Sequence, residues 1–367
     1  MELEEDALIV IRHDSEFPRE DVEAIGRRLS SSGALVAGYV PPDVGMLSIP
    51  AIQLGQTLDQ TETIVVVDRN IASRMAGIAR NGLLRPLDKP TAIAVDVMAF
   101  AQAVNFKIDP TIAFHELGNK EGNEVACEEL AWFQVADAGN AQAWIDLAQG
   151  RIDHLPPGAP LHVEAHDLAF PLERWRRNYI VALKVAELEL SDRSPIMRAQ
   201  SLFQWMVEDF FLAGPAAIFA TMYFSPFARK RRLLKQLRSE NRERALAGLK
   251  NAAWDMTHLS ELSRNAKKSI VANAFYIFAT ADAGLAEIAP VLIIDADDDA
   301  FVDTLSPSLE GWWPKGDARI LGQSLHGHVK SIEGREPPGP SFKSDDPIQD
   351  LINEGEARVR AWRNGKL

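Results

Sequence analysis

Residues 63–68 read Thr-Ile-Val-Val-Val-Asp, a run of mostly β-branched residues that ends in an acid. Continuous runs of this kind are typical of parallel strands that are covered on both faces. In open α/β sheets the carboxyl end of such a strand faces the ligand crevice, and Asp68 follows directly at that end. A helix is predicted to begin near Asn70. The stretch therefore predicts an α/β fold built on a parallel sheet.

The rest of the chain alternates predicted strands with longer helical segments, separated by loops that are rich in proline and glycine. The predicted elements are a β-α-β opening (7–11, 19–29, 34–39), helices over 91–150, a proline-bounded loop at 151–171, helices over 172–250 and 253–267, strands at 274–279 and 291–294 around a short helix at 283–289, a flexible segment at 337–346 and a terminal helix at 348–362.

Composition and charge narrow the class of protein. The chain of 367 residues is 46% hydrophobic and 25% charged, which excludes a wholly disordered or fibrous protein. Its formal net charge of −13 argues against a general nucleic-acid coat protein, although one local basic face remains compatible with it. Because Cys127 is the single cysteine, the chain can form neither an intramolecular disulfide nor a cysteine-rich zinc site.

Several features predict a cytoplasmic protein without a membrane role. A single cysteine fits a reducing compartment. The acidic stretch 1–6 differs from a signal peptide, which begins with basic residues. The most apolar segment, 210–227, is interrupted by Pro215 and Pro226 and is short for a membrane span. We expect it to form a buried helix pair.

Residues 229–250 form a basic segment in this otherwise acidic chain, with nine Lys or Arg side chains against Glu240 and Glu243. Two interpretations are open. The segment is either a solvated helix face or a surface that binds a phosphate backbone. On the second interpretation, the side chains expected to contact substrate are Arg229, Arg231, Arg232 and Lys235.

Four acids are embedded in apolar sequence: Asp68, Glu116 in IAFHELGN, Asp255 in NAAWDMTHL and Asp282 in FATAD. Charged side chains are rarely buried without a partner, and hard cations such as Mg²⁺ and Mn²⁺ take oxygen ligands. Together the acids predict a metal site. Each also has a simpler explanation as an ion-pair partner or helix cap; Asp255 would cap the helix after Ala253, and Asp282 the helix from Ala283.

The segments VVVDRN, FHELGN, AAWDMTHLSEL and FATADAGL resemble, in this order, the four signature regions of PIN-like nucleases. In that family a strand ends in Asp with a polar residue two positions later, a helical Glu follows, a third acid begins a helix, and the next strand ends in Thr-x-Asp. The matching residues here are Asp68 with Asn70, Glu116, Asp255, and Thr280 with Asp282. The resemblance covers about residues 61–295; the gap between Glu116 and Asp255 is longer than in compact members.

The resemblance implies a PIN-like parallel sheet flanked by helices, with a large helical insertion. The chain would then divide into an N-terminal β-α-β extension (1–60), the first half of the PIN-like domain (61–150), the helical insertion (151–250), the second half of the domain (251–300) and a partly flexible C-terminal extension (301–367).

The resemblance also implies a metal-dependent endonuclease that cleaves phosphodiester bonds, with RNA preferred and with Mg²⁺ or Mn²⁺ as cofactor. Asp68, Glu116, Asp255 and Asp282 would be the catalytic residues and metal ligands. Asn70 and Thr280 would support those ligands by hydrogen bonds or contact the substrate.

Two alternatives stay open. One is a non-catalytic interaction or regulatory protein on the same fold, whose acids are satisfied by Arg or Lys and whose helical insertion is a surface for a second copy or a regulatory protein partner. The other rests on Asp295-x-Asp297, which resembles the nucleophile motif of haloacid-dehalogenase-like phosphatases. Too few residues follow it for the rest of that core, so we do not favour it.

Overall fold

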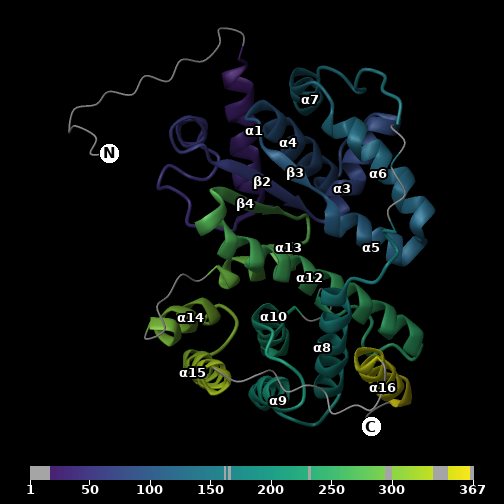
Figure 1. The fold of residues 1–367 in the computed structure, drawn as a ribbon, viewed down its shortest axis with the longest axis vertical. Coiled ribbons are helices and arrows are strands. Elements are labelled where there is room, and N and C mark those ends of the chain that lie inside the picture. The colour runs from purple at the N-terminus through teal and green to yellow at the C-terminus, as the bar shows by residue number, and fades with distance from the viewer. Residues whose placement is uncertain are drawn as a thin grey trace, which may run out of the picture. The chain divides into compact units, whose positions relative to one another are not determined.

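A computed structural model of the protein describes residues 17–160, 163, 167–229, 233–293, 300–333 and 346–363. They form two compact units. Unit 1 comprises the described residues of Met1–Ala169 and Asn265–Ala281, and unit 2 those of Phe170–Arg264 and Asp282–Leu367. The chain thus leaves unit 1, builds part of unit 2, returns to complete unit 1 and leaves it again (Figure 1).

The sheet of unit 1 has four strands in the order β1-β4-β2-β3. Their bounds are β1 (Leu35–Ala37), β2 (Glu62–Val67), β3 (Lys107–Asp109) and β4 (Ala274–Ala279). Strand β2 is parallel to both β3 and β4, whereas the edge strand β1 is antiparallel to β4. The protein is therefore a mixed α/β protein with a mostly parallel sheet, and the predicted strands at 63–67 and 274–279 are its two central strands.

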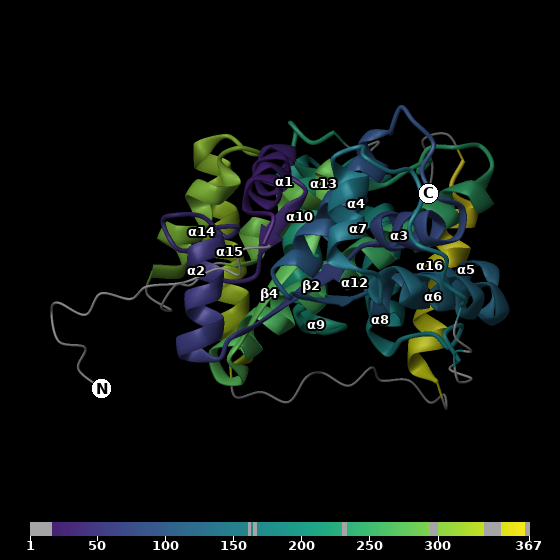
Figure 2. The same ribbon diagram turned by 90° about the horizontal axis from the view of Figure 1, so that it is seen from above.

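Helices flank this sheet. In unit 1 they are α1 (Arg19–Ser32), α2 (Ile49–Leu54) with the π-helical turn η1 (Gly55–Asp59), α3 (Arg69–Asn81), α4 (Lys89–Ala103), α5 (Thr111–Glu121), α6 (Asn123–Asp137) and α7 (Ala141–Ala148). Helix α3 packs against α4 and α6, and α4 also packs against α1 and α7 (Figure 2). Residues 93–101 of α4 are all buried, as expected of a helix that is apolar on every side and lies in the core. Asp96 is the one charged residue among them, and its carboxylate pairs with the Arg28 guanidinium at 2.6 Å.

Unit 2 is helical in its described residues. It contains α8 (Glu173–Glu189), α9 (Pro195–Glu208), α10 (Gly214–Phe224), most of α12 (Arg242–Ala272), α13 (Ala283–Ile288), the 3₁₀ turn η2 (Ala289–Leu292), α14 (Phe301–Leu309), α15 (Lys315–Ile332) and α16 (Pro347–Ala361). Helix α16 packs against α8 (Figure 1). There the Tyr179 hydroxyl donates to Glu356 Oε1 at 2.8 Å, and Arg358 pairs with Glu187 at 3.1 Å.

The apolar segment 210–227 forms one buried helix rather than the expected helix pair. This helix is α10, and its residues 216–224 are all buried. Among the residues with a described position, no helix combines the length and the apolar character needed to cross a membrane.

The prediction of a strand at 291–294 is wrong for residues 291–293, the part that the structure describes. Residues 289–292 form the 3₁₀ turn η2, and the Ile293 amide donates to the Pro290 carbonyl at 3.1 Å. Pro290 has no amide hydrogen to give to a neighbouring strand, which favours a turn at this point. Asp295 and Asp297 of the phosphatase-like motif, and the predicted flexible segment 337–346 up to residue 345, lie outside the described residues.

Asp137, the last residue of α6, generates a prediction about pH. Burial raises the pKa of its carboxyl group, and a negative charge at a helix C-terminus also opposes the helix dipole. Since the folded-state pKa lies above the unfolded one, the contribution of Asp137 to stability is present at low pH and is lost as pH rises through the folded-state pKa. Asp137→Asn should therefore raise the free energy of unfolding at neutral pH by up to about 1 kcal/mol.

Urea unfolding at neutral pH and below about pH 3.5, where the side chain is mostly protonated in both states, measures this effect. The difference should be close to zero at the lower pH. Asp350→Asn is the control, because Asp350 lies in the first turn of α16, where a carboxylate is favourable. An Asp137→Asn protein that is less stable than wild type at neutral pH would contradict the argument.

Candidate functional site

The candidate site lies at the carboxyl edge of the parallel strands in unit 1. From β2 the chain crosses to β3 on one side, and it later returns to form β4 on the other side of β2. The direction of winding reverses between β2 and β4, and in open α/β sheets ligands bind outside the carboxyl ends of the strands at such a point. The register pairs Val67 with Ala279, so Asp68 and Thr280 follow β2 and β4 side by side.

Asp68 connects three elements through its carboxylate. It is 4% exposed and forms the N-cap of α3, where its Oδ1 accepts a hydrogen bond from the Ile71 amide at 2.8 Å. Its Oδ2 accepts from the Thr280 hydroxyl at 2.6 Å and from the Ala281 amide at 3.3 Å. The carboxylate therefore links the end of β2, the start of α3 and the end of β4 in one orientation.

Thr280 is almost completely buried. Besides its hydroxyl bond to Asp68, its amide donates to the Ala34 carbonyl at 2.9 Å, just before β1. That Thr280 supports a metal ligand stays a prediction. Such a role requires a hydrogen bond to the ligand, and the Thr280 hydroxyl donates one to Asp68. Asn70 is exposed in the first turn of α3.

Asp109 is a candidate that sequence reasoning missed. The register pairs Val66 of β2 with Asp109 at the end of β3, so this acid lies at the same edge of the sheet as Asp68. It is half-buried, and its Oδ1 accepts from the Thr111 amide at the start of α5 at 2.9 Å. Strand β3 is too short to stand out as a hydrophobic run. The available signal is an acid directly before Pro110, a residue that breaks the predicted helical stretch 91–150 at this point.

A second missed group surrounds the start of α3. Arg69, its first residue, pairs with Glu129 of α6 at 2.9 Å. The Ser73 hydroxyl donates to the same carboxylate oxygen at 2.8 Å. This part-buried cluster fixes α3 against α6 and places a guanidinium group directly after Asp68 in the chain.

Glu116 belongs to unit 1 and lies, half-buried, in α5, which begins at the carboxyl end of β3. The neighbouring His115 ring contacts the Leu168 carbonyl through Nδ1 at 3.1 Å. The predicted helical position of Glu116 is thus present.

Asp282 belongs to unit 2, directly after the unit boundary and two residues after Thr280. It caps α13, as one interpretation predicted: its Oδ1 accepts from the amides of Gly284 at 2.8 Å and Leu285 at 3.4 Å. The cap function alone accounts for an acid at this position.

The prediction that Asp255 lies at a helix start and caps it is wrong. Asp255 lies well inside α12, which begins at Arg242. The cap comes instead from the Asn241 side chain, which accepts from the amides of Glu243 at 3.1 Å and Arg244 at 3.3 Å. The segment between them is rich in Ala and Leu, which favour helix, so the helix runs through the predicted start.

The predicted four-acid metal cage therefore draws on both units, with Asp68 and Glu116 in unit 1 and Asp255 and Asp282 in unit 2. Within the described ranges, no three His, Cys, Asp or Glu side chains form a group that could hold a metal ion. The cage stays a prediction. Among its four acids, Asp68 is the one whose carboxylate is held by hydrogen bonds at the carboxyl edge of the sheet.

The basic segment is not one continuous helix face. Residues 234–239 form turns, and the helical part resumes with α12. Arg229 and Lys235 are exposed, whereas Arg231 and Arg232 lie outside the described residues. Arg242 is occupied in the fold, because its guanidinium donates to the carbonyls of Leu237, Ser239 and Val359.

No family model, no curated protein and no solved structure matches this chain. The resemblance to PIN-like nucleases consequently rests on the four quoted segments, and function has to be argued from the site itself.

Replacing Thr280 with Val should lower the free energy of unfolding by about 1–3 kcal/mol, because the buried Asp68 carboxylate loses a donor without a change in side-chain shape. Thr280→Ser keeps the hydroxyl and should retain most of that stability. Chemical denaturation of the two variants and the wild type makes the comparison. Equal stability of the Val variant and the wild type would show that the Asp68–Thr280 bond does not contribute.

Proposed function

We propose that the protein is a metal-dependent endonuclease that hydrolyses phosphodiester bonds, with RNA as its substrate. The observation that supports the proposal is the position of Asp68 and Thr280, joined by a 2.6 Å hydrogen bond where the winding of the sheet reverses. The preference for RNA comes from the resemblance to PIN-like nucleases.

The donor groups at this edge of the sheet suit Mg²⁺ or Mn²⁺. Asp68 and Asp109 offer carboxylate oxygens, the class of ligand that hard divalent cations prefer. Mg²⁺ in particular keeps several waters and is bound through one or two carboxylates together with substrate phosphates, so a preformed group of three acids is not a requirement. Asp68 would be the first ligand, and Glu116, Asp255 and Asp282 are the acids proposed to complete the site.

When bound, the ion would supply charge stabilisation at the phosphoryl group and a more acidic water. The protein's own contribution is to hold Asp68 in one orientation. The Ile71 amide fixes one carboxylate oxygen, and the Thr280 hydroxyl and Ala281 amide fix the other. A ligand whose rotamer is set by such bonds loses little conformational entropy when it binds an ion. The exposed cations Arg229 and Lys235 are the proposed contacts to the substrate backbone.

A non-catalytic interaction protein is the second candidate, and one observation favours it. Asp68 and Asp282 each cap a helix, which is a sufficient structural reason for both acids.

The nuclease proposal predicts cleavage of labelled single-stranded RNA in the presence of Mn²⁺ or Mg²⁺ and its inhibition by EDTA. Asp68→Asn and Asp255→Asn should each lower the cleavage rate by about a hundredfold or more, because each removes a charged ligand of the ion. Asp88→Asn is the matched control. Asp88 caps α4 as Asp68 caps α3, accepting from the Thr91 amide at 2.8 Å, but it is exposed and does not follow a strand.

Failure of the wild type to cleave RNA or DNA, together with an absence of metal binding in calorimetry, would replace the nuclease with the interaction protein. An equal loss of activity in Asp68→Asn and Asp88→Asn would assign the effect to the loss of a negative charge at a helix N-terminus rather than to chemistry.

A further inference from the structure

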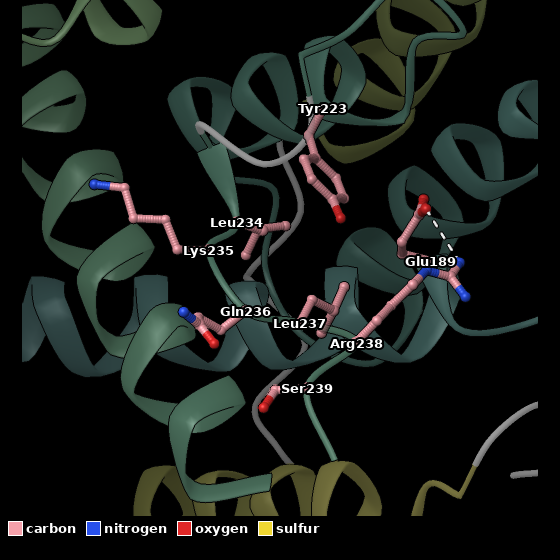
Figure 3. Close-up of a pocket in the computed structure, with 8 residues that line it drawn as sticks. All are labelled: Glu189, Tyr223, Leu234, Lys235, Gln236, Leu237, Arg238 and Ser239. Atoms are coloured by element: carbon pink, nitrogen blue, oxygen red, sulfur yellow. Dashed lines mark ion pairs between the residues drawn. The ribbon is translucent and has the colours of Figure 1, made fainter. Parts of the chain in front are cut away.

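Unit 2 contains a cavity of about 620 Å³, within the range of roughly 300–1,000 Å³ that small-molecule sites occupy. Its lining comes from the end of α8, from α10 and from the turn at residues 234–239 (Figure 3). Gln236 in this turn has a φ of 64°, a conformation that residues other than glycine rarely adopt. The turn brings Leu234 and Leu237 to the cavity together with Arg238.

One part of the cavity wall is apolar and aromatic, beside the polar and charged residues that line the rest. Leu234 and Leu237 are buried, and so is Tyr223, whose ring lies beside them with the hydroxyl directed toward the cavity (Figure 3). Burial, followed by the charge of Glu189, raises the pKa of the Tyr223 hydroxyl. Tyr223 therefore keeps its proton at neutral pH and can act as a hydrogen-bond donor.

The charges around the cavity favour an anion. Glu189 is 4% exposed, and its Oε2 accepts a hydrogen bond from Arg198 Nη1 at 2.7 Å. Arg238 Nη2 lies 3.7 Å from Glu189 Oε1, within ion-pair range but too far for a hydrogen bond. Arg198 thus already compensates the buried carboxylate, and the guanidinium of Arg238, whose side chain is 63% exposed, can turn toward a ligand. Lys235 also belongs to the lining, but its ammonium group points away from Tyr223 and Arg238 (Figure 3), so Arg238 is the cation that the proposal uses.

We propose that this cavity binds a small organic oxyanion. Its phosphate or carboxylate group meets Arg238 and the Tyr223 hydroxyl, and its flat or apolar body packs against Leu234 and Leu237. The site belongs to unit 2 alone and does not depend on the metal chemistry proposed for the acids. Phosphate and carboxylate groups each present two oxygens that can accept the paired hydrogen bonds of an arginine guanidinium.

Isothermal titration calorimetry of the full chain with adenosine monophosphate, benzoate and inorganic phosphate tests the proposal. EDTA in every titration removes any contribution from a metal ion. We expect one site per chain for at least one of the two organic anions, with tighter binding than that of inorganic phosphate, which cannot use the apolar walls. Phenyl phosphate, which has the same ring as benzoate, is titrated as well, and the preference between these two ligands identifies the anionic group.

Arg238→Gln should weaken this binding by about tenfold or more, the loss expected for a charged hydrogen-bonding partner. Tyr223→Phe should weaken it as well, and thermal unfolding checks that this buried variant remains folded. Arg244→Gln is the matched control, because Arg244 is exposed in the same basic segment and does not line the cavity. Binding of neither organic anion, undiminished binding by Arg238→Gln, or inorganic phosphate that binds as tightly as the organic anions would overturn the proposal.

Discussion

The parallel pairing of β2 with β4 is the constraint on which the remainder of unit 1 depends. The register that sets Val67 beside Ala279 also sets Asp68 beside Thr280, although these two residues are 212 positions apart in the chain. β4 pairs with the edge strand β1 on its other side, and β2 pairs with β3. A shift of one residue between β2 and β4 would change which side chains face each other and separate the acid from its hydroxyl donor.

The buried carboxylate of Asp68 would be costly if its hydrogen bonds were lost, because an unsatisfied charged group in the interior costs more than the bond itself contributes. Here the cost is offset by a helix cap and by two donors from the end of β4. The same bonds serve two explanations, since they stabilise the junction of three elements and also hold a potential metal ligand in place. The structure alone fits both explanations. Asp88, which caps α4 without following a strand, is therefore the informative comparison for Asp68.

Local sequence patterns predict both central strands of the sheet and most of the helices. The β-branched run before Asp68 and the aromatic run before Thr280 both form central strands, and the acids that follow each strand were expected to cap helices or bind a ligand. Features that depend on tertiary contacts, such as strand pairing, cannot be predicted from local sequence patterns in the same way. The predicted strand at 34–39 contains β1, but its antiparallel pairing with β4 does not follow from a local pattern. Strand β3 has only three residues and no periodicity of its own, so nothing in the sequence pattern marks Asp109 as the end of a strand. Aspartate is a common helix cap, which is why Asp255 is predicted to cap a helix. The residues before it are rich in Ala and Leu and are themselves helical, so the helix begins just after Asn241 instead. Whether four acids act together depends on how distant segments fold, which neither periodicity nor spacing encodes.

The division of unit 1 into two stretches of chain has a consequence for its synthesis. A ribosome releases Met1–Ala169 long before Asn265–Ala281 emerges, and these later residues contain β4, the strand between β1 and β2. Until then β2 has an unpaired edge, the kind of surface that promotes association between chains. Unit 1 therefore cannot finish folding before the first part of unit 2 has been synthesised, unlike an N-terminal domain that is continuous in sequence. The sheet of unit 1 therefore stays incomplete while the helices of Phe170–Arg264 are made.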